Sequence, residues 1–210
     1  GFDLTGVESV AALKRRLAGR ARSDTAAVLV GANWIESKWK PAVFPTRQDL
    51  DAVVSDRPVI LSRVDGHAVV VNTKALEAIG ITRETPDPPG GQIQRDAATG
   101  EATGILIDNA MDRAWDLVPD ATDEELARRL EVGAATYVAD GWTELQYAGT
   151  TWREIDQLCK LYAAGKLKLR VYAAIRGPGE DAQKLLAAGS GYKSCDPRLT
   201  VRGIKLFMDG

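Results

Sequence analysis

From residue 142 to residue 207 the chain reads WTELQYA (142–148), REIDQLCKLYAAG (153–165), KLRVYAAI (168–175), DAQKLLAAG (181–189) and LTVRGIKLF (199–207). The first, third and fifth blocks are short, apolar and rich in strand-forming residues, whereas the other two have the spacing of amphipathic helices. Connections of this length join parallel strands. The stretch therefore predicts an α/β protein with a parallel sheet or a (β/α) barrel.

Lys205 lies within the last of these strands, in VRGIKLFMDG (201–210). A lysine in an apolar run is costly to bury unless its charge is neutralised or its amine is used. One interpretation is a lysine at a strand edge that extends to solvent. The other is a lysine at the C-terminal end of a barrel strand, carbamylated and so converted into an anionic metal ligand. Asp209 and Gly210 suit the loop that follows such a strand.

The composition is that of an ordinary soluble globular protein. The 210 residues carry a net charge of −2, so nothing indicates a nucleic-acid partner. No apolar run reaches membrane-spanning length and no signal peptide is visible, so we expect a cytoplasmic protein with no membrane partner. Secretion stays open because the chain begins without methionine. The single histidine, His67, cannot form a zinc site alone, and Cys159 and Cys195 neither pair by spacing nor form a metal knuckle.

The first 140 residues predict helices with polar caps and short strands. Ser9, Thr46 and Thr122 are expected to cap helices, and Asn72 or Thr73 a fourth. The expected strands and the hairpin are 26–33, 58–64, 68–71 and 92–107.

Several blocks in the same order resemble a known superfamily. They are GANWIESKW (31–39), LDAVVSDRPVILSRVDGHAVVVNTKALEAIGIT (50–82), TPDPPGGQIQRD (85–96), TGEATGILID (99–108) and the terminal VRGIKLFMDG. The chain resembles the amidohydrolase superfamily, and more narrowly the amidohydrolase-3 branch that includes N-substituted formamide deformylases.

The resemblance implies a (β/α)8 barrel with catalytic metals at the C-terminal ends of its strands. Strands 2, 3 and 4 would be the segments near 142–147, 168–175 and 200–207, which places Lys205 where a bridging metal ligand is expected. Residues 1–25 would be a helix that follows strand 1, residues 26–115 an α+β insertion that covers the barrel mouth, and residues 116–210 the barrel segment.

The resemblance also implies that the chain is a central fragment. A His-x-His strand is expected before Gly1, and two histidines and an aspartate are expected after Gly210. Without them the chain is expected to be inactive, with Lys205 unmodified and reaching solvent or paired with Asp209 or Glu144.

Further residues are candidates for substrate contacts or for local structure. The resemblance favours His67 as a catalytic, substrate-side residue, and the alternative is a histidine that bonds a turn. Arg63 either binds an anionic substrate group or forms an ion pair. Trp34 either lines an apolar substrate pocket or packs under a loop. Asp108, Asp112 and Asp116 follow one another at intervals of four residues, which indicates a solvated helix face. Asp65 and Gly66 are expected to shape a turn.

These observations favour a metal-dependent amidohydrolase that cleaves the C–N bond of an amide, formamide or cyclic amide through a metal-bound hydroxide. The resemblance implies one or two divalent ions, most often zinc, and a small-molecule amide substrate. Two alternatives stay open: a truncated or degenerate chain that acts only as a structural or binding fragment, and an unrelated βαβ protein. Homo-oligomers are also left open.

Overall fold

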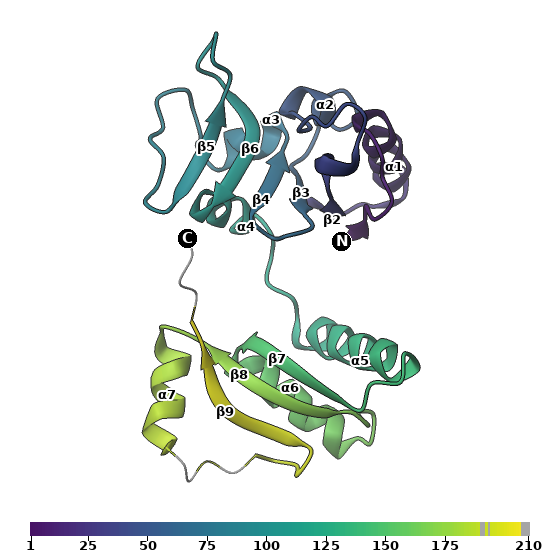
Figure 1. Ribbon diagram of the computed structural model, residues 1–210, viewed down its shortest axis with the longest axis vertical. Helices are drawn as coiled ribbons and strands as arrows, with labels where there is room; N and C mark the ends of the chain where they lie inside the picture. Colours follow the sequence, from purple (N-terminus) through teal and green to yellow (C-terminus); the bar gives the residue numbers. More distant parts are fainter. Residues whose placement is uncertain (190–191, 193, 207–210) are drawn as a thin grey trace. The chain divides into compact units, whose positions relative to one another are not determined.

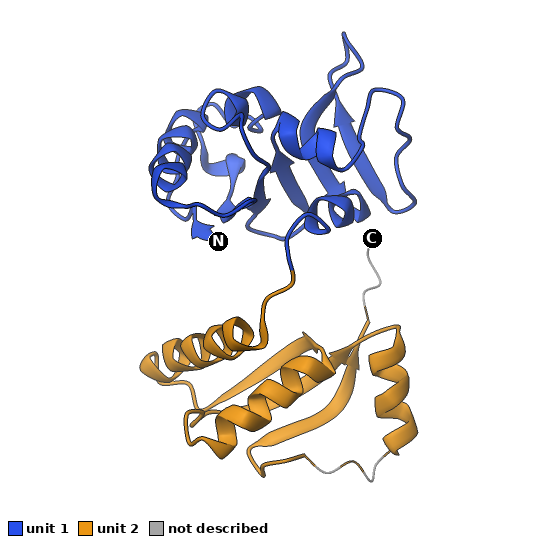
Figure 2. Cartoon of the chain, turned by 180° about the vertical axis from the view of Figure 1, so that it is seen from behind, with its two compact units in different colours: residues 1–119, 210 blue, residues 120–209 orange. Residues whose placement is uncertain are grey.

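The structure is a computed structural model that describes all residues except 190, 191, 193 and 207–210 (Figure 1). The chain forms two compact units, Gly1–Pro119 and Asp120–Asp209, which are blue and orange in Figure 2. Each unit has its own sheet and its own apolar core. None of the helices in the described ranges is long and apolar enough to cross a membrane.

Unit 1 contains a six-stranded mixed sheet in the order β1-β2-β3-β4-β6-β5. The first three strands are parallel to one another, and the other pairings are antiparallel. The strands are β1 (Phe2–Asp3), β2 (Leu29–Trp34), β3 (Val59–Arg63), β4 (Ala68–Val71), β5 (Gly91–Arg95) and β6 (Ala102–Asp108). The helices are α1 (Val10–Ser23), η1 (Glu36–Lys38), α2 (Arg47–Asp51), α3 (Thr73–Ala78), η2 (Asn109–Met111) and α4 (Asp112–Trp115). The expected hairpin is confirmed as β5 and β6.

Both faces of this sheet are covered, because successive side chains of a strand point to opposite faces. One face packs with helices α1 and α2 into a cluster that includes Leu13, Leu17, Leu50, Val59, Leu61, Val70 and Ile105. The other packs with α3 and α4 into a cluster that includes Ile60, Val69, Val71, Leu76, Leu106 and Ala114. Burial on both sides explains why β3 and β4 are continuous apolar runs in the sequence.

Polar side chains begin the helices where the sequence predicted them. Ser9 accepts a backbone N–H of α1, and Thr46 forms a capping box with α2. Asn72, rather than Thr73, caps α3. Thr122 forms the expected capping box at the start of the long helix of unit 2. Each cap satisfies a backbone N–H that has no partner within its helix, so these predictions follow from local chemistry alone.

Unit 2 contains a three-stranded sheet in the order β7-β8-β9, and both pairings are parallel. Its elements are α5 (Asp123–Ala139), β7 (Glu144–Thr150), α6 (Trp152–Ala163), β8 (Arg170–Arg176), α7 (Glu180–Ala188) and β9 (Leu199–Lys205). The predicted alternation of parallel strands and helices is confirmed. Open α/β sheets and (β/α)8 barrels share this arrangement.

The core of unit 2 lies on one face of its sheet. Val171, Ala173 and Ile175 of β8 alternate along the strand and pack with α6, α7 and the edge of α5. The residues between them, Tyr172 and Ala174, belong to the opposite face and are half-buried. The two faces of β8 therefore have different environments.

A disulfide joins Cys159 of α6 to Cys195 in the segment before β9. The interpretation that these cysteines do not pair was wrong. They are 36 residues apart in sequence, and the packing of α6 beside the strand that follows Cys195 brings them together. Sequence spacing does not reveal such a contact, because it depends on tertiary structure.

Candidate functional site

The turn between β3 and β4 positions His67. Gly66 has a φ of +80°, a conformation that glycine adopts without strain, and its N–H donates to the Arg63 carbonyl oxygen at 3.1 Å. The backbone N–H of His67 donates to Asp65 Oδ1 at 3.2 Å. The expectation that Asp65 and Gly66 shape this turn is confirmed.

Asp108 contacts the His67 ring from the end of β6. The distance between His67 Nδ1 and Asp108 Oδ1 is 2.8 Å, and the Asp108 N–H donates to the His67 carbonyl oxygen at 3.1 Å. The His67 side chain is 56% exposed and that of Asp108 is 33% exposed, so part of the ring is accessible while Asp108 holds Nδ1. This pair is the candidate site of unit 1.

Asp108 is the residue that sequence reasoning missed. We expected Asp108, Asp112 and Asp116 on one helix face, but Asp108 ends strand β6 and α4 begins only at Asp112. The register supplies a signal that a strand assignment could have used. Ala68 pairs with Ile107 in the antiparallel ladder of β4 and β6, so the next residue pair along the ladder is His67 and Asp108.

Arg63 binds carboxylates of the chain itself. Its Nε and Nη2 atoms donate to the two carboxylate oxygens of Glu36 at 2.8 and 2.9 Å, and its Nη1 donates to Asp65. The bonds from Arg63 lower the pKa of Glu36, and the same pair raises the pKa of Arg63. The guanidinium therefore links η1 to the turn that carries His67.

Trp34 lies in the core of unit 1 and has no exposed surface. Its indole N–H donates to the Leu61 carbonyl oxygen at 2.8 Å. Its ring packs against Trp39 and Phe44, with ring centroids 6.2 and 6.0 Å away. The structure thus places Trp34 in local packing rather than on a pocket wall.

Lys205 is the last residue of β9 and stands at the carboxyl end of the parallel sheet. It pairs in register with Arg176, the last residue of β8. A Cβ atom at Gly149 of β7 would lie 3.9 Å from Lys205 Cγ and 3.9 Å from Arg176 Nε. The side chains of Lys205 and Arg176 therefore both lie close to Gly149. This is the edge at which parallel α/β proteins bind ligands.

The expected pairing of Lys205 with Glu144 is wrong. Glu144 begins β7 and lies next to Arg170, the first residue of β8, whereas Lys205 ends β9 next to Arg176. Arg170 Nε donates to Glu144 Oε2 at 3.0 Å, at the opposite end of the sheet from Lys205. The other expected partner, Asp209, lies outside the described residues.

The described residues do not form a metal site by themselves. No three His, Cys, Asp or Glu side chains in the described part of the chain lie close enough together to hold a metal ion. Zinc sites in proteins have three or four protein ligands. Lys205 would supply only one ligand group even when carbamylated. The described residues alone therefore do not complete the ligand set of a metal ion.

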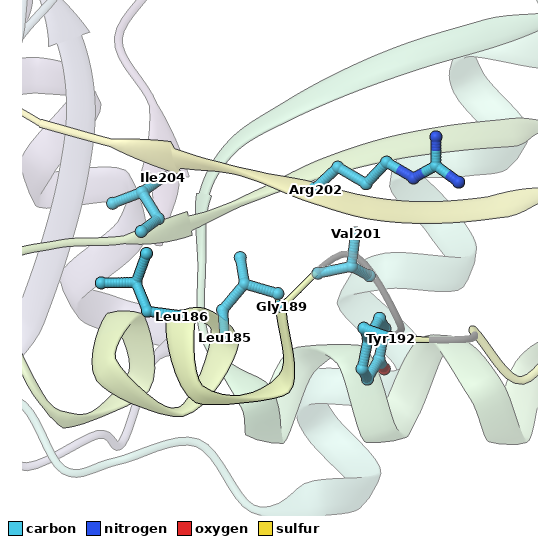
Figure 3. A pocket seen from close by; sticks show the side chains of 7 residues that line it. All are labelled: Leu185, Leu186, Gly189, Tyr192, Val201, Arg202 and Ile204. Carbon is cyan, nitrogen blue, oxygen red and sulfur yellow. The ribbon is translucent and has the colours of Figure 1, made fainter.

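A groove of about 400 Å³ lies between α7 and β9 in unit 2. Figure 3 shows Leu185 and Leu186 of α7 opposite Val201 and Ile204 of β9. Its walls are mainly apolar, and Arg202 is its only charged lining residue among those described. The groove offers mainly apolar packing surface, with the phenol of Tyr192 among its lining groups.

Comparison with known proteins shows the family. A model of the amidohydrolase family matches residues 1–210, which is the whole chain. The chain belongs to the amidohydrolase family. This match confirms the resemblance inferred from the motifs around His67 and Lys205.

Two relatives illustrate the range of this amidohydrolase family. The chain is 34% identical over 191 residues to YtcJ of Bacillus subtilis (strain 168), whose name describes it as an amidohydrolase; the alignment covers 87% of this chain and 34% of YtcJ. It is 30% identical over 141 residues to the N-substituted formamide deformylase of Arthrobacter pascens, covering 65% of this chain and 26% of that enzyme. The chain spans about a third of the length of the curated relatives it matches.

Two solved structures share the fold of this amidohydrolase chain. They are uncharacterized metal-dependent hydrolases from Pyrococcus horikoshii and Pyrococcus furiosus, with TM-scores of 0.63 and 0.61. The sequences are 24% and 23% identical, and each comparison covers 99% of this chain and 39% or 40% of the solved chain. The likeness supports a common backbone arrangement.

Proposed function

We propose that this chain belongs to a metal-dependent hydrolase that cleaves the C–N bond of an amide, formamide or cyclic amide. The observation that carries the proposal is the position of Lys205 at the carboxyl end of a parallel strand, in a chain that matches the amidohydrolase family over its whole length. The relative named N-substituted formamide deformylase supports the substrate class.

The proposed architecture is a (β/α)8 barrel in which β7, β8 and β9 are strands 2, 3 and 4. Their parallel pairing in sequence order, with a helix after β7 and another after β8, supports this assignment. Active sites of such barrels lie at the carboxyl ends of the strands, where Lys205 is found. Residues 26–115, which lie within unit 1, would then be the insertion that precedes strand 2 and selects the substrate.

Lys205 is proposed as one ligand of a divalent metal, zinc in the first instance, after carbamylation of its amine. Its neighbour in the ladder, Arg176, supports this chemistry. An anionic carbamate at this position would be attracted to the guanidinium of Arg176. The remaining ligands are to be sought beyond the described residues.

In unit 1 the proposal assigns substrate contact to His67, whose ring is partly accessible. The contacts of Arg63 and Trp34 support different roles. Arg63 holds the turn through Glu36 and Asp65, and Trp34 supports β2 and β3 from the core. No contact among the described residues favours the alternative of an inactive structural fragment.

The test uses the complete gene product and a panel of simple amides, N-substituted formamides and cyclic amides, with esters and phosphate esters as controls. We expect hydrolysis of at least one C–N substrate, its loss after chelation, and its recovery when zinc and bicarbonate are restored. Hydrolysis that survives complete metal removal, or activity confined to the control esters, would overturn the proposal.

A further inference from the structure

The contact between His67 and Asp108 determines where the imidazole carries its proton. The two atoms, His67 Nδ1 and Asp108 Oδ1, are 2.8 Å apart, which is a hydrogen-bond distance. An ionised carboxylate only accepts hydrogen bonds, so the bond requires a proton on Nδ1. In the neutral ring, Nε2 then carries a lone pair and no proton.

Asp108 is held in place by its own backbone and by the chain on either side. Its φ is +47°, which is uncommon for a residue other than glycine. The next residue, Asn109, donates from its backbone N–H to the Gly90 carbonyl oxygen at 3.2 Å and from Nδ2 to the Pro89 carbonyl oxygen at 2.9 Å. A Cβ on Gly91 would lie 2.4 Å from the Ala110 nitrogen, so this close approach requires glycine. An uncommon backbone conformation that is fixed from several sides is typical of functional positions.

The turn that carries His67 is held by a series of bonded charged groups. Asp65 accepts its backbone N–H, Arg63 binds Asp65, and Glu36 binds Arg63 with both carboxylate oxygens. The charged groups bonded to the ring and its turn are therefore Asp108, Asp65, Arg63 and Glu36. Of these, Asp108 bonds to the ring itself, at Nδ1.

We infer that Asp108 is the positioning residue of His67, and that it restricts Nε2 to donating a hydrogen bond only when the imidazole is protonated. This inference rests on the proposed function, in which His67 faces the substrate. A neutral His67 with its proton on Nδ1 cannot donate to a substrate carbonyl from Nε2, whereas the imidazolium can.

The test uses the ¹⁵N-labelled 210-residue chain, because its single histidine gives one imidazole signal pattern. Two-bond ¹H–¹⁵N correlation spectra recorded across a pH titration report the tautomer of the neutral ring and the titration midpoint. The variant is Asp108→Asn, since asparagine has nearly the same size and shape as aspartate but carries no charge. The matched control is Asp112→Asn, which makes the same change at an exposed aspartate of α4.

In the wild type and in D112N we expect the neutral ring to carry its proton on Nδ1. In D108N the Nε2–H form should gain population, and the midpoint should move to lower pH because the imidazolium loses an anionic neighbour. A wild-type ring protonated on Nε2, or a D108N titration identical to that of D112N, would overturn the inference.

The readout needs neither metal nor substrate, so it separates two failures. If D108N changes the tautomer but the complete gene product hydrolyses no amide, the positioning role stands and the proposed function fails. If amide hydrolysis is found but the tautomer and midpoint do not respond to D108N, the inference about Asp108 fails alone.

Discussion

The sheets of the two units differ in how many of their faces carry an apolar core. The mixed sheet of unit 1 has helices and apolar clusters on both faces, whereas the core of unit 2 lies on one face of its parallel sheet. Of the twelve largest fully buried side chains among the described residues, ten lie in unit 1, and unit 2 contributes only Ile155 and Leu167. Of the nine exposed large apolar side chains in the described part of the chain, unit 2 holds six: Val132, Tyr137, Val138, Trp142, Leu186 and Leu206.

The difference in core packing indicates which substitutions should affect stability. Parallel sheets are normally covered on both faces, whereas the core of unit 2 lies on one face of β7, β8 and β9. Lys205 and Arg176 lie at the carboxyl edge of this sheet. Unit 1 has a complete core, and its candidate site is a surface turn held by hydrogen bonds. Substitutions should therefore be costly for stability in the core of unit 1 and mild on the exposed apolar surface of unit 2.

The largest expected effect compares two tryptophans. Trp34→Ala should lower the free energy of unfolding of unit 1 by about 4 kcal/mol, because it removes a fully buried ring and its bond to Leu61. Trp142→Ala should change stability by less than about 0.5 kcal/mol, because that ring is 59% exposed. Urea denaturation measures both. A stable W34A protein with weakened substrate binding would show instead that Trp34 lines a pocket.

The disulfide tests the stability of unit 2. The double variant Cys159→Ser/Cys195→Ser opens a link between residues 36 apart and should lower the free energy of unfolding by about 3 kcal/mol. The loss should appear in peptides of α6 and β9 by hydrogen exchange and leave unit 1 unchanged. Reductant should reproduce it in the wild type and have no effect on the double variant. A wild-type protein that is equally stable with and without reductant would contradict a stabilising role of the disulfide.

A smaller loss of stability is expected for the ion pair of unit 1. Arg63→Ala should lower the free energy of unfolding at neutral pH by about 1 kcal/mol, because Glu36 loses two charge-assisted bonds. Arg63 holds the pKa of Glu36 below its ordinary value of 4.5. The stability that this shift contributes is present above pH 4.5 and is lost as the pH falls through the lowered pKa.

The pH dependence provides the control for this prediction. The acid-side decline in stability should become shallower in R63A, and the exposed Arg128→Ala of α5 should leave the profile unchanged. An R63A profile that is parallel to that of the wild type would mean that Glu36 is stabilised by something other than Arg63.

The sequence predicted those features that depend on neighbouring residues. The caps at Ser9, Thr46 and Thr122, the hairpin of β5 and β6, and the parallel order of β7 to β9 all follow from local patterns. The position of Lys205 at the end of a strand could also be read from its apolar neighbours.

The contacts that join distant segments could not be predicted in this way. The bond between His67 and Asp108 spans 41 residues and depends on the register of β4 and β6. The disulfide depends on where α6 packs. The burial of Trp34 was undecided because an aromatic residue near a loop has the same sequence pattern in a core and in a pocket wall.

Metal content per chain tests the central claim most directly, since the proposal makes Lys205 a metal ligand. The complete gene product, its Lys205→Ala variant and the matched control Lys168→Ala, which alters an exposed lysine before β8, are compared by elemental mass spectrometry and amide hydrolysis. We predict stoichiometric metal in the wild type and K168A, and in K205A a loss of metal with a fall in activity of at least about 100-fold. A K205A protein with wild-type metal content and activity would contradict the account.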